Sequence, residues 1–142
     1  MNYCTLLFGH AYDTHLKVLE VAQKKSVRVI ANENYFAHTN PIFIDLKILK
    51  FKDIYKHKVG IYMYKNIDSF SRHLPSHDYE TRSGNSLNAV NQRLTLTQRQ
   101  SLQFQGPIIW NSIPDNIRNA PSLNIFKKQY KQFLLSSYEN VE

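Results

Sequence analysis

The chain has few of the residues that break or cross-link a polypeptide. Its 142 residues include four Gly, five Pro and one Cys. A single Cys excludes an intrachain disulfide, so packing and hydrogen bonds must hold the fold together. The small numbers of Gly and Pro favour helices joined by short connections.

Long apolar runs are also missing from the sequence. No stretch of about 18 consecutive apolar residues occurs, so we expect neither a membrane-spanning helix nor a membrane partner. The segment Met1–Phe8 is too short for a signal peptide and lacks its basic start. These features and the single Cys lead us to expect an intracellular protein, in the cytoplasm or the nucleus.

Apolar residues make up 42% of the chain and charged residues 20%, which is typical of a globular domain with a packed core rather than of a disordered chain. The 18 Lys and Arg outnumber the 11 Asp and Glu, giving a formal charge of +7. Such an excess favours a polyanionic partner, nucleic acid above all. The alternative is that the basic residues only keep the protein soluble.

Apolar periodicity predicts a mainly α fold of four to six helices. The expected helices run over 13–30, from an Asn40 cap and Pro41, over 52–66, from Pro107 to Pro114, and over 123–136 after a Ser122 cap. On the first of them, Leu16, Leu19, Val27 and Ile30 form the predicted apolar stripe.

Three less regular parts complete the prediction. The alternation in Ser101–Phe104 predicts one short extended segment, and residues 68–92 have the composition of a polar surface loop. Residues 1–12 are interpreted as a lead-in and residues 139–142 as a tail. A single domain is therefore expected over residues 13–138.

The segment Gly106–Arg118 is the most distinctive in the chain because it contains the only Trp and two of the five Pro. Pro107 suits the first turn of a helix, and Pro114 would stop that helix. We interpret the segment as a rigid apolar corner with Trp110 as its anchor, against which Phe126 of the last helix packs.

The corner also carries a family resemblance, together with two other blocks in the same order. The three blocks are Gln23–Ile30, His77–Arg82 and Gly106–Arg118. They resemble the C-terminal region of reverse transcriptases from non-LTR retrotransposons, LINE elements of the jockey or CR1 type. This chain departs from the family pattern at Glu80, where Asn is usual, and in a linker before His77 that looks shortened.

The resemblance implies a post-thumb domain whose partner is the upstream body of an RNA-directed DNA polymerase. Polymerase chemistry needs carboxylates that hold divalent metals such as Mg²⁺, typically including an adjacent Asp pair. This sequence contains no adjacent acidic pair. We therefore expect no catalytic residues and no cofactor in this chain, although the parent enzyme would use the metal.

Other site chemistries find little support in the sequence. The residues considered as metal ligands are Cys4, His10, His15, His73 and His77. Their spacings do not make the paired pattern of a zinc site, and no context supports a Cys–His nucleophile. We expect no metal site.

Basic residues are the remaining candidates for function. Those assigned to nucleic-acid binding are Lys24, Lys25, Arg28, Lys47, Lys50, Lys52, Arg82 and Arg93, with Lys56, Lys58 and Arg99 nearby in the sequence. Lysine and arginine contact phosphates without regard to sequence. The aromatic residues Tyr35, Phe36, Tyr62, Tyr64 and Tyr79 would stack on bases if exposed, or would instead lie at the edge of the core.

The expected function is that of an accessory reverse-transcriptase fragment that binds RNA or DNA non-specifically. Two alternatives remain open: a structural module that only packs on the polymerase body, and a decayed, non-functional copy of the element.

Overall fold

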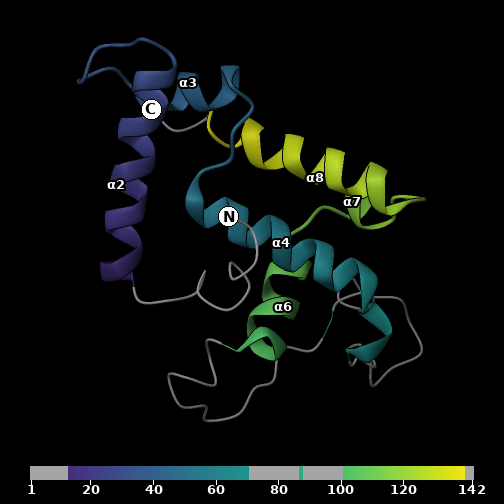
Figure 1. The fold of residues 1–142 in the computed structure, drawn as a ribbon. Helices are drawn as coiled ribbons and strands as arrows, with labels where there is room; N and C mark the ends of the chain where they lie inside the picture. The colour runs from purple at the N-terminus through teal and green to yellow at the C-terminus, as the bar shows by residue number, and fades with distance from the viewer. Residues whose placement is uncertain (1–12, 71–86, 88–100, 140–142) are drawn as a thin grey trace. The chain divides into compact units, whose positions relative to one another are not determined.

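The computed structural model describes residues 13–70, 87 and 101–139, and these are mainly helical (Figure 1). The elements are α2 (Asp13–Ile30), α3 (Thr39–Asp45), α4 (Phe51–Lys65), the 3-10 helix η1 (Ile67–Ser69), α6 (Leu102–Asn111), α7 (Asp115–Arg118) and α8 (Leu123–Ser136). The predicted mainly α fold is confirmed. The lead-in 1–12 and nearly all of the predicted loop 68–92 lie outside the described residues.

Helices α2, α4 and α8 begin and end within one or two residues of the predicted bounds. Ser122 caps α8: its carbonyl accepts from the Phe126 amide at 2.9 Å, and its hydroxyl lies 3.4 Å from the Ile125 amide. The prediction that Asn40 caps α3 was wrong, because His38 is the N-cap residue and the helix begins at Thr39. Pro41 is thus the third helical residue, where a missing amide hydrogen costs no intrahelical bond.

The extended segment predicted over Ser101–Phe104 was also wrong. Ser101 precedes α6, and its carbonyl accepts from the amides of Phe104 and Gln105 at 3.1 and 2.9 Å. Pro107 therefore lies inside α6 rather than at its start. A four-residue alternation is too short to separate a strand from the first turn of a helix.

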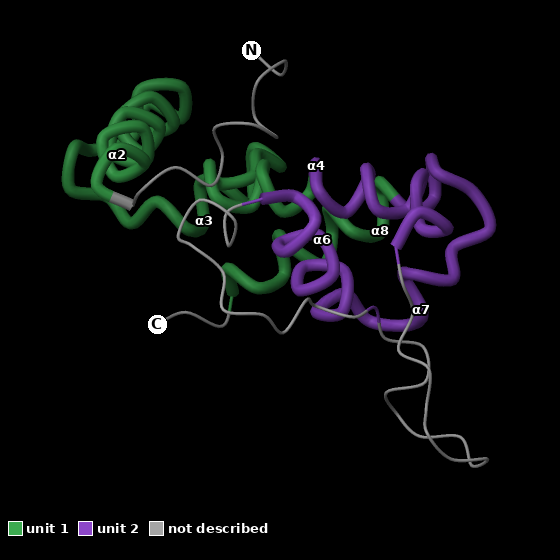
Figure 2. Tube along the Cα trace, turned by 90° about the horizontal axis from the view of Figure 1, so that it is seen from below, with its two compact units in different colours: residues 1–57, 127–142 green, residues 58–126 purple. Residues whose placement is uncertain are grey.

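The described residues cluster into two compact units (Figure 2). Unit 1 contains residues 1–57 and 127–142, and unit 2 contains residues 58–126. Both boundaries fall inside helices, α4 and α8. The single domain expected over 13–138 stays a prediction.

Unit 1 is built around the buried side chains of Val27, Ile42, Phe43 and Tyr138. The rings of Phe43 and Tyr138 meet edge to face, with centroids 6.4 Å apart. Each large apolar side chain removed from water in this way contributes about 1.5–3 kcal/mol. Helix α8 adds Tyr130, whose ring stacks on His57 with centroids 5.7 Å apart.

Helix α2 is apolar on two sides, and only one of them is covered. Leu16 and Val27 are buried as predicted, but Leu19 and Ile30 are exposed, which corrects half of the predicted stripe. Val18 and Val29 are also 70% and 79% exposed. Periodicity identified apolar positions correctly but could not tell which of them another element would cover.

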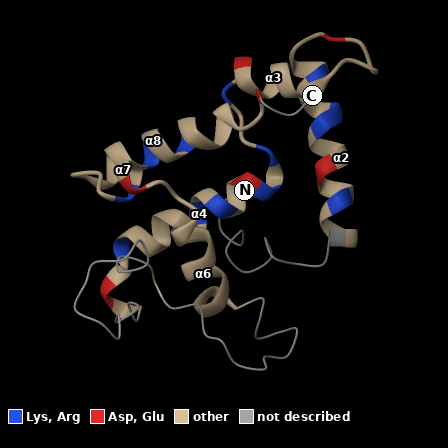
Figure 3. Ribbon diagram, turned by 180° about the vertical axis from the view of Figure 1, so that it is seen from behind, with Lys and Arg blue, Asp and Glu red and all other residues tan. Residues whose placement is uncertain are grey.

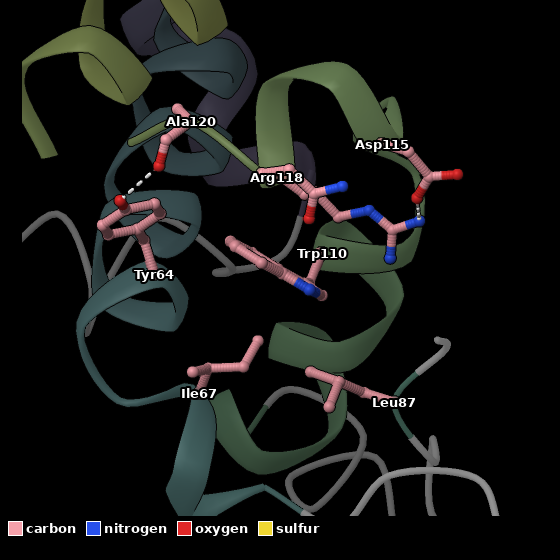
Figure 4. Close-up of a pocket in the computed structure, with 8 residues that line it drawn as sticks. Tyr64, Ile67, Leu87, Trp110, Asp115, Arg118 and Ala120 are labelled. Atoms are coloured by element: carbon pink, nitrogen blue, oxygen red, sulfur yellow. Dashed lines mark hydrogen bonds and ion pairs between the residues drawn. The ribbon is translucent and has the colours of Figure 1, made fainter. Parts of the chain in front are cut away.

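Unit 2 contains the Trp110 corner (Figure 4). Trp110, Pro107 and Phe126 are buried, and the indole stacks on the Phe126 ring with centroids 5.8 Å apart. The ring of Tyr64 stacks on the same Phe126 ring at 4.7 Å, and its hydroxyl donates to the Ala120 carbonyl at 2.7 Å. Pro114 lies between α6 and α7, as the predicted helix stop requires.

Candidate nucleic-acid interface

Four lysines gather around one cavity of about 240 Å³ in unit 1. We call this cavity the lysine pocket, and its lining residues are Glu20, Gln23, Lys24, Phe43, Lys50, Lys52, Asp53 and Lys56. Basic residues recur along α2 and near the start of α4 (Figure 3). The pocket thus joins three of the predicted phosphate-binding residues, Lys24, Lys50 and Lys52, to a fourth lysine.

The side-chain amide of Gln23 explains why the two segments meet. Its Nε2 donates to the Leu49 carbonyl at 2.9 Å, and its Oε1 accepts from the Phe51 amide at 2.9 Å. These two bonds attach the start of α4 to the middle of α2. Lys24 follows Gln23, while Lys50 and Lys52 flank Phe51, so the same attachment brings these three lysines to the lining of one pocket.

Lys50 is the most constrained of the four lysines. Its Nζ donates to Asn40 Oδ1 at 2.8 Å and lies 4.1 Å from the centre of the Tyr138 ring. Burial lowers the pKa of Lys50, and the charge of Lys24 adds to that effect, against the opposing charges of Asp53 and Glu20. An anion bound in the pocket would stabilise the charged form of Lys50, so the pocket favours anionic ligands.

The two carboxylates of the pocket are already engaged. Asp53 accepts from the Tyr138 hydroxyl at 2.6 Å and pairs with Lys56 Nζ at 2.9 Å. Glu20 lies 3.6 Å from Lys52 at the surface, where ion pairs contribute little. Four lysines against two carboxylates leave the lining with a formal charge of +2.

The other predicted residues have different surroundings. Arg28 lies one helical turn beyond Lys24 on the same side of α2, whereas Lys25 is exposed on a neighbouring face. Lys47 does not line the pocket and has a left-handed backbone, with φ of 52°. Arg82 and Arg93 lie outside the described residues.

The aromatic candidates divide into exposed and packed residues. Tyr35 and Phe36, in the connection after α2, are 62% and 87% exposed. Tyr64 packs in unit 2, as the alternative interpretation required, and Tyr62 is half-buried. Tyr79 falls in an undescribed stretch of the chain.

A second cavity, of about 520 Å³, lies in unit 2 beside Trp110 (Figure 4). Arg118 pairs with Asp115 there, and its buried Nε has no hydrogen-bond partner among the described residues. Asn111 holds Leu87 by accepting from its amide at 3.0 Å and donating to its carbonyl at 2.9 Å. The lining has one cation and one anion, so nothing in its charge favours a phosphate.

Sequence reasoning missed the residues that organise the lysine pocket, Gln23, Asn40 and Tyr138. One signal was present: Gln23 lies seven residues after Leu16 and four before Val27, on the buried side of α2. A polar side chain on such a stripe must find hydrogen-bond partners.

Within the described ranges, no group of three or more His, Cys, Asp or Glu could hold a metal ion. In the same ranges, none of the helices combines the length and the apolar character that a membrane span requires. Cys4, His10, His73 and His77 are outside the described part of the chain. No protein-family model matches the sequence, and neither the curated proteins nor the solved structures include a match.

Proposed function

We propose that this chain binds the phosphate backbone of RNA or DNA, without sequence preference, through the lysine pocket. The observation that carries the proposal is the convergence of Lys24, Lys50 and Lys52 with Lys56 around one cavity of net positive charge. The family resemblance of the sequence gives this binding a context, as an accessory region of a LINE-type reverse transcriptase that lies outside the catalytic core.

The physical basis is counterion release. Lysines that neutralise phosphates displace condensed cations, so affinity falls steeply as salt rises. Three phosphate contacts give a slope of log K against log salt of about −2 for a single strand and about −3 for a duplex. The lowered pKa of Lys50 adds a further effect, because a bound phosphate favours its protonated form.

Fluorescence anisotropy with a labelled RNA of mixed sequence tests the proposal across a range of salt concentrations. The double variant Lys24→Ala/Lys52→Ala should bind less tightly and show a slope smaller by about 1–2. Lys65→Ala/Lys128→Ala removes the same charge from exposed positions outside the pocket and serves as the matched control. Equal losses in both variants, or binding that ignores salt, would contradict the proposal.

A second candidate function is packing against a larger protein body, and the exposed apolar side of α2 favours it. Val18, Leu19, Val29 and Ile30 leave apolar surface in water. Such patches mark interaction sites or cause self-association. If packing is the function, light scattering should show concentration-dependent oligomers that Val18→Ser/Val29→Ser abolishes, together with no salt-dependent RNA binding.

A further inference from the structure

Two aromatic side chains in the connection after α2 are exposed to water. Phe36 is 87% exposed and Tyr35 is 62% exposed, and their rings meet edge to face with centroids 5.2 Å apart. Burying side chains of this size would remove much apolar surface from water, and in this structure that surface stays exposed. The exposed ring faces are therefore available to a ligand.

The connection that carries these rings is held by several hydrogen bonds. Asn32 has a left-handed backbone with φ of 55°, and the Glu33 amide donates to the Arg28 carbonyl at 2.9 Å, which closes the end of α2. The Asn34 side-chain Oδ1 then accepts from the Phe36 amide at 3.1 Å. The backbone carbonyl of Asn34 accepts from the Ala37 amide at 2.9 Å. The rings are thus presented on an ordered turn, which lowers the entropy lost on binding.

Arg28 connects this turn to the basic side of α2. Its Nε donates to the Ala37 carbonyl at 2.9 Å, and its guanidinium lies 6.0 Å from the centre of the Tyr35 ring. Lys24, in the lysine pocket, is four residues earlier on the same face of the helix, about 6 Å along the axis. Positive charge therefore continues from the pocket to the aromatic turn.

We propose that Phe36 and Tyr35 form a stacking platform for unpaired bases, so that the chain prefers single-stranded nucleic acid to duplex. This inference rests on the proposed phosphate binding. A strand whose phosphates contact Lys24 and Arg28 can turn a base onto the Phe36 ring, because every base has a π face. In a duplex both faces of each base are covered by neighbouring pairs, so the platform finds no partner there.

The test compares a mixed-sequence single-stranded oligonucleotide with a duplex of the same sequence. Phe36→Ala should weaken single-strand binding by about five- to 100-fold and leave duplex binding unchanged within about twofold. Phe36→Trp, which keeps an aromatic face, should restore the single-strand affinity. Ile108→Ala removes another exposed apolar side chain and is the control. Because the Phe36 side chain is mostly exposed, these variants should fold as the parent does, which circular dichroism checks.

The outcomes separate this inference from the proposed function. If the parent protein binds neither nucleic acid in a salt-dependent way, the phosphate-binding proposal fails and the platform fails with it. If the parent binds in a salt-dependent way but Phe36→Ala lowers the affinities for single strand and duplex equally, or changes neither of them, the platform is overturned and the phosphate-binding proposal stands. It is also overturned if Phe36→Ala weakens binding to vesicles of anionic phospholipid and not to the single strand.

Discussion

The hydroxyl of Tyr138 donates a 2.6 Å hydrogen bond to the carboxylate of Asp53, although 85 residues separate the two in sequence. Both side chains are buried, and the same hydroxyl accepts from the Lys50 amide at 3.0 Å. Tyr138, near the C-terminal end of the described chain, therefore holds two lining residues of the lysine pocket, Asp53 and Lys50. Tyr138→Phe should lower the free energy of unfolding by about 1–3 kcal/mol, because the buried Asp53 carboxylate loses one of its donors and the Lys50 amide loses its acceptor. Urea denaturation at pH 7 measures the change, and Tyr35→Phe, at an exposed position, should change it by less than about 0.5 kcal/mol.

Alkaline pH should destabilise the protein through its buried tyrosines. Burial, and then the charge of Asp53, raises the pKa of Tyr130 above its usual value of 10. A raised pKa in the folded state means that stability is retained below pH about 10 and is lost as pH rises further, since only the unfolded chain then ionises. In Tyr130→Phe the loss of stability above pH 10 should be smaller by up to about 1.4 kcal/mol per pH unit. Urea unfolding at pH 8, 10 and 11 compares the slopes, and identical slopes in the variant and the parent would exclude Tyr130 as the group responsible.

Gln23→Ala should affect both stability and binding. It removes the two bonds that attach the start of α4 to α2, which leaves the Leu49 carbonyl and the Phe51 amide without that partner. The expected cost is about 1–3 kcal/mol in free energy of unfolding. Because the pocket lysines lose their common attachment, RNA affinity should fall although no charge is removed. Gln103→Ala, at an exposed position, is the matched control. Unchanged RNA affinity in folded Gln23→Ala protein would show that the attachment does not position the lysines.

Lys47→Gly should stabilise the chain. Lys47 has φ of 52° just after α3, and the Ile48 amide donates to the Phe43 carbonyl at 2.9 Å. This is the arrangement of a Schellman C-cap, in which the left-handed residue is usually Gly. Relief of the left-handed backbone outweighs the extra entropy of Gly in the unfolded state, for a net gain of about 0.5–1 kcal/mol. Lys131→Gly, inside α8, should instead cost about 1 kcal/mol. Melting temperatures that shift in the same direction in both variants would refute this account.

Trp110→Ala should loosen unit 2 at a cost of about 3–5 kcal/mol. The substitution removes the indole that stacks on Phe126 and leaves a cavity beside a buried ring. Ile108→Ala, two residues earlier but exposed, should cost less than about 1 kcal/mol. Differential scanning calorimetry compares the two, and a Trp110→Ala melt like that of the parent protein would show that the corner has another anchor.

Much of the helical structure could be predicted because its determinants are local. The apolar period over 13–30 and 123–136, and the cap at Ser122, act within a few residues and specify those helices correctly. The errors arose where local signals were short or compatible with two structures. Ser101–Phe104 alternates over only four residues, and Pro41 is tolerated anywhere in the first turn of α3.

The candidate site could be predicted only in part. Charge and spacing selected Lys24, Lys50 and Lys52 individually, yet they also selected Lys47, which lies elsewhere. The place of Gln23 on the apolar stripe of α2 indicated that its amide would need hydrogen-bond partners, but not that these would be the backbone groups on both sides of Lys50. No local signal indicated that Asp53 would meet Tyr138.

The sequence by itself thus determined most of the helical segments, where the apolar and basic residues lie along them, and that Trp110 and Phe126 belong to a core. The tertiary structure decided which side of α2 is covered, which lysines share a cavity, and that Phe36 remains in water. The physical reason is the range of the forces involved: backbone propensity and capping act over about one turn of helix, whereas burial and hydrogen bonding depend on residues tens of positions away.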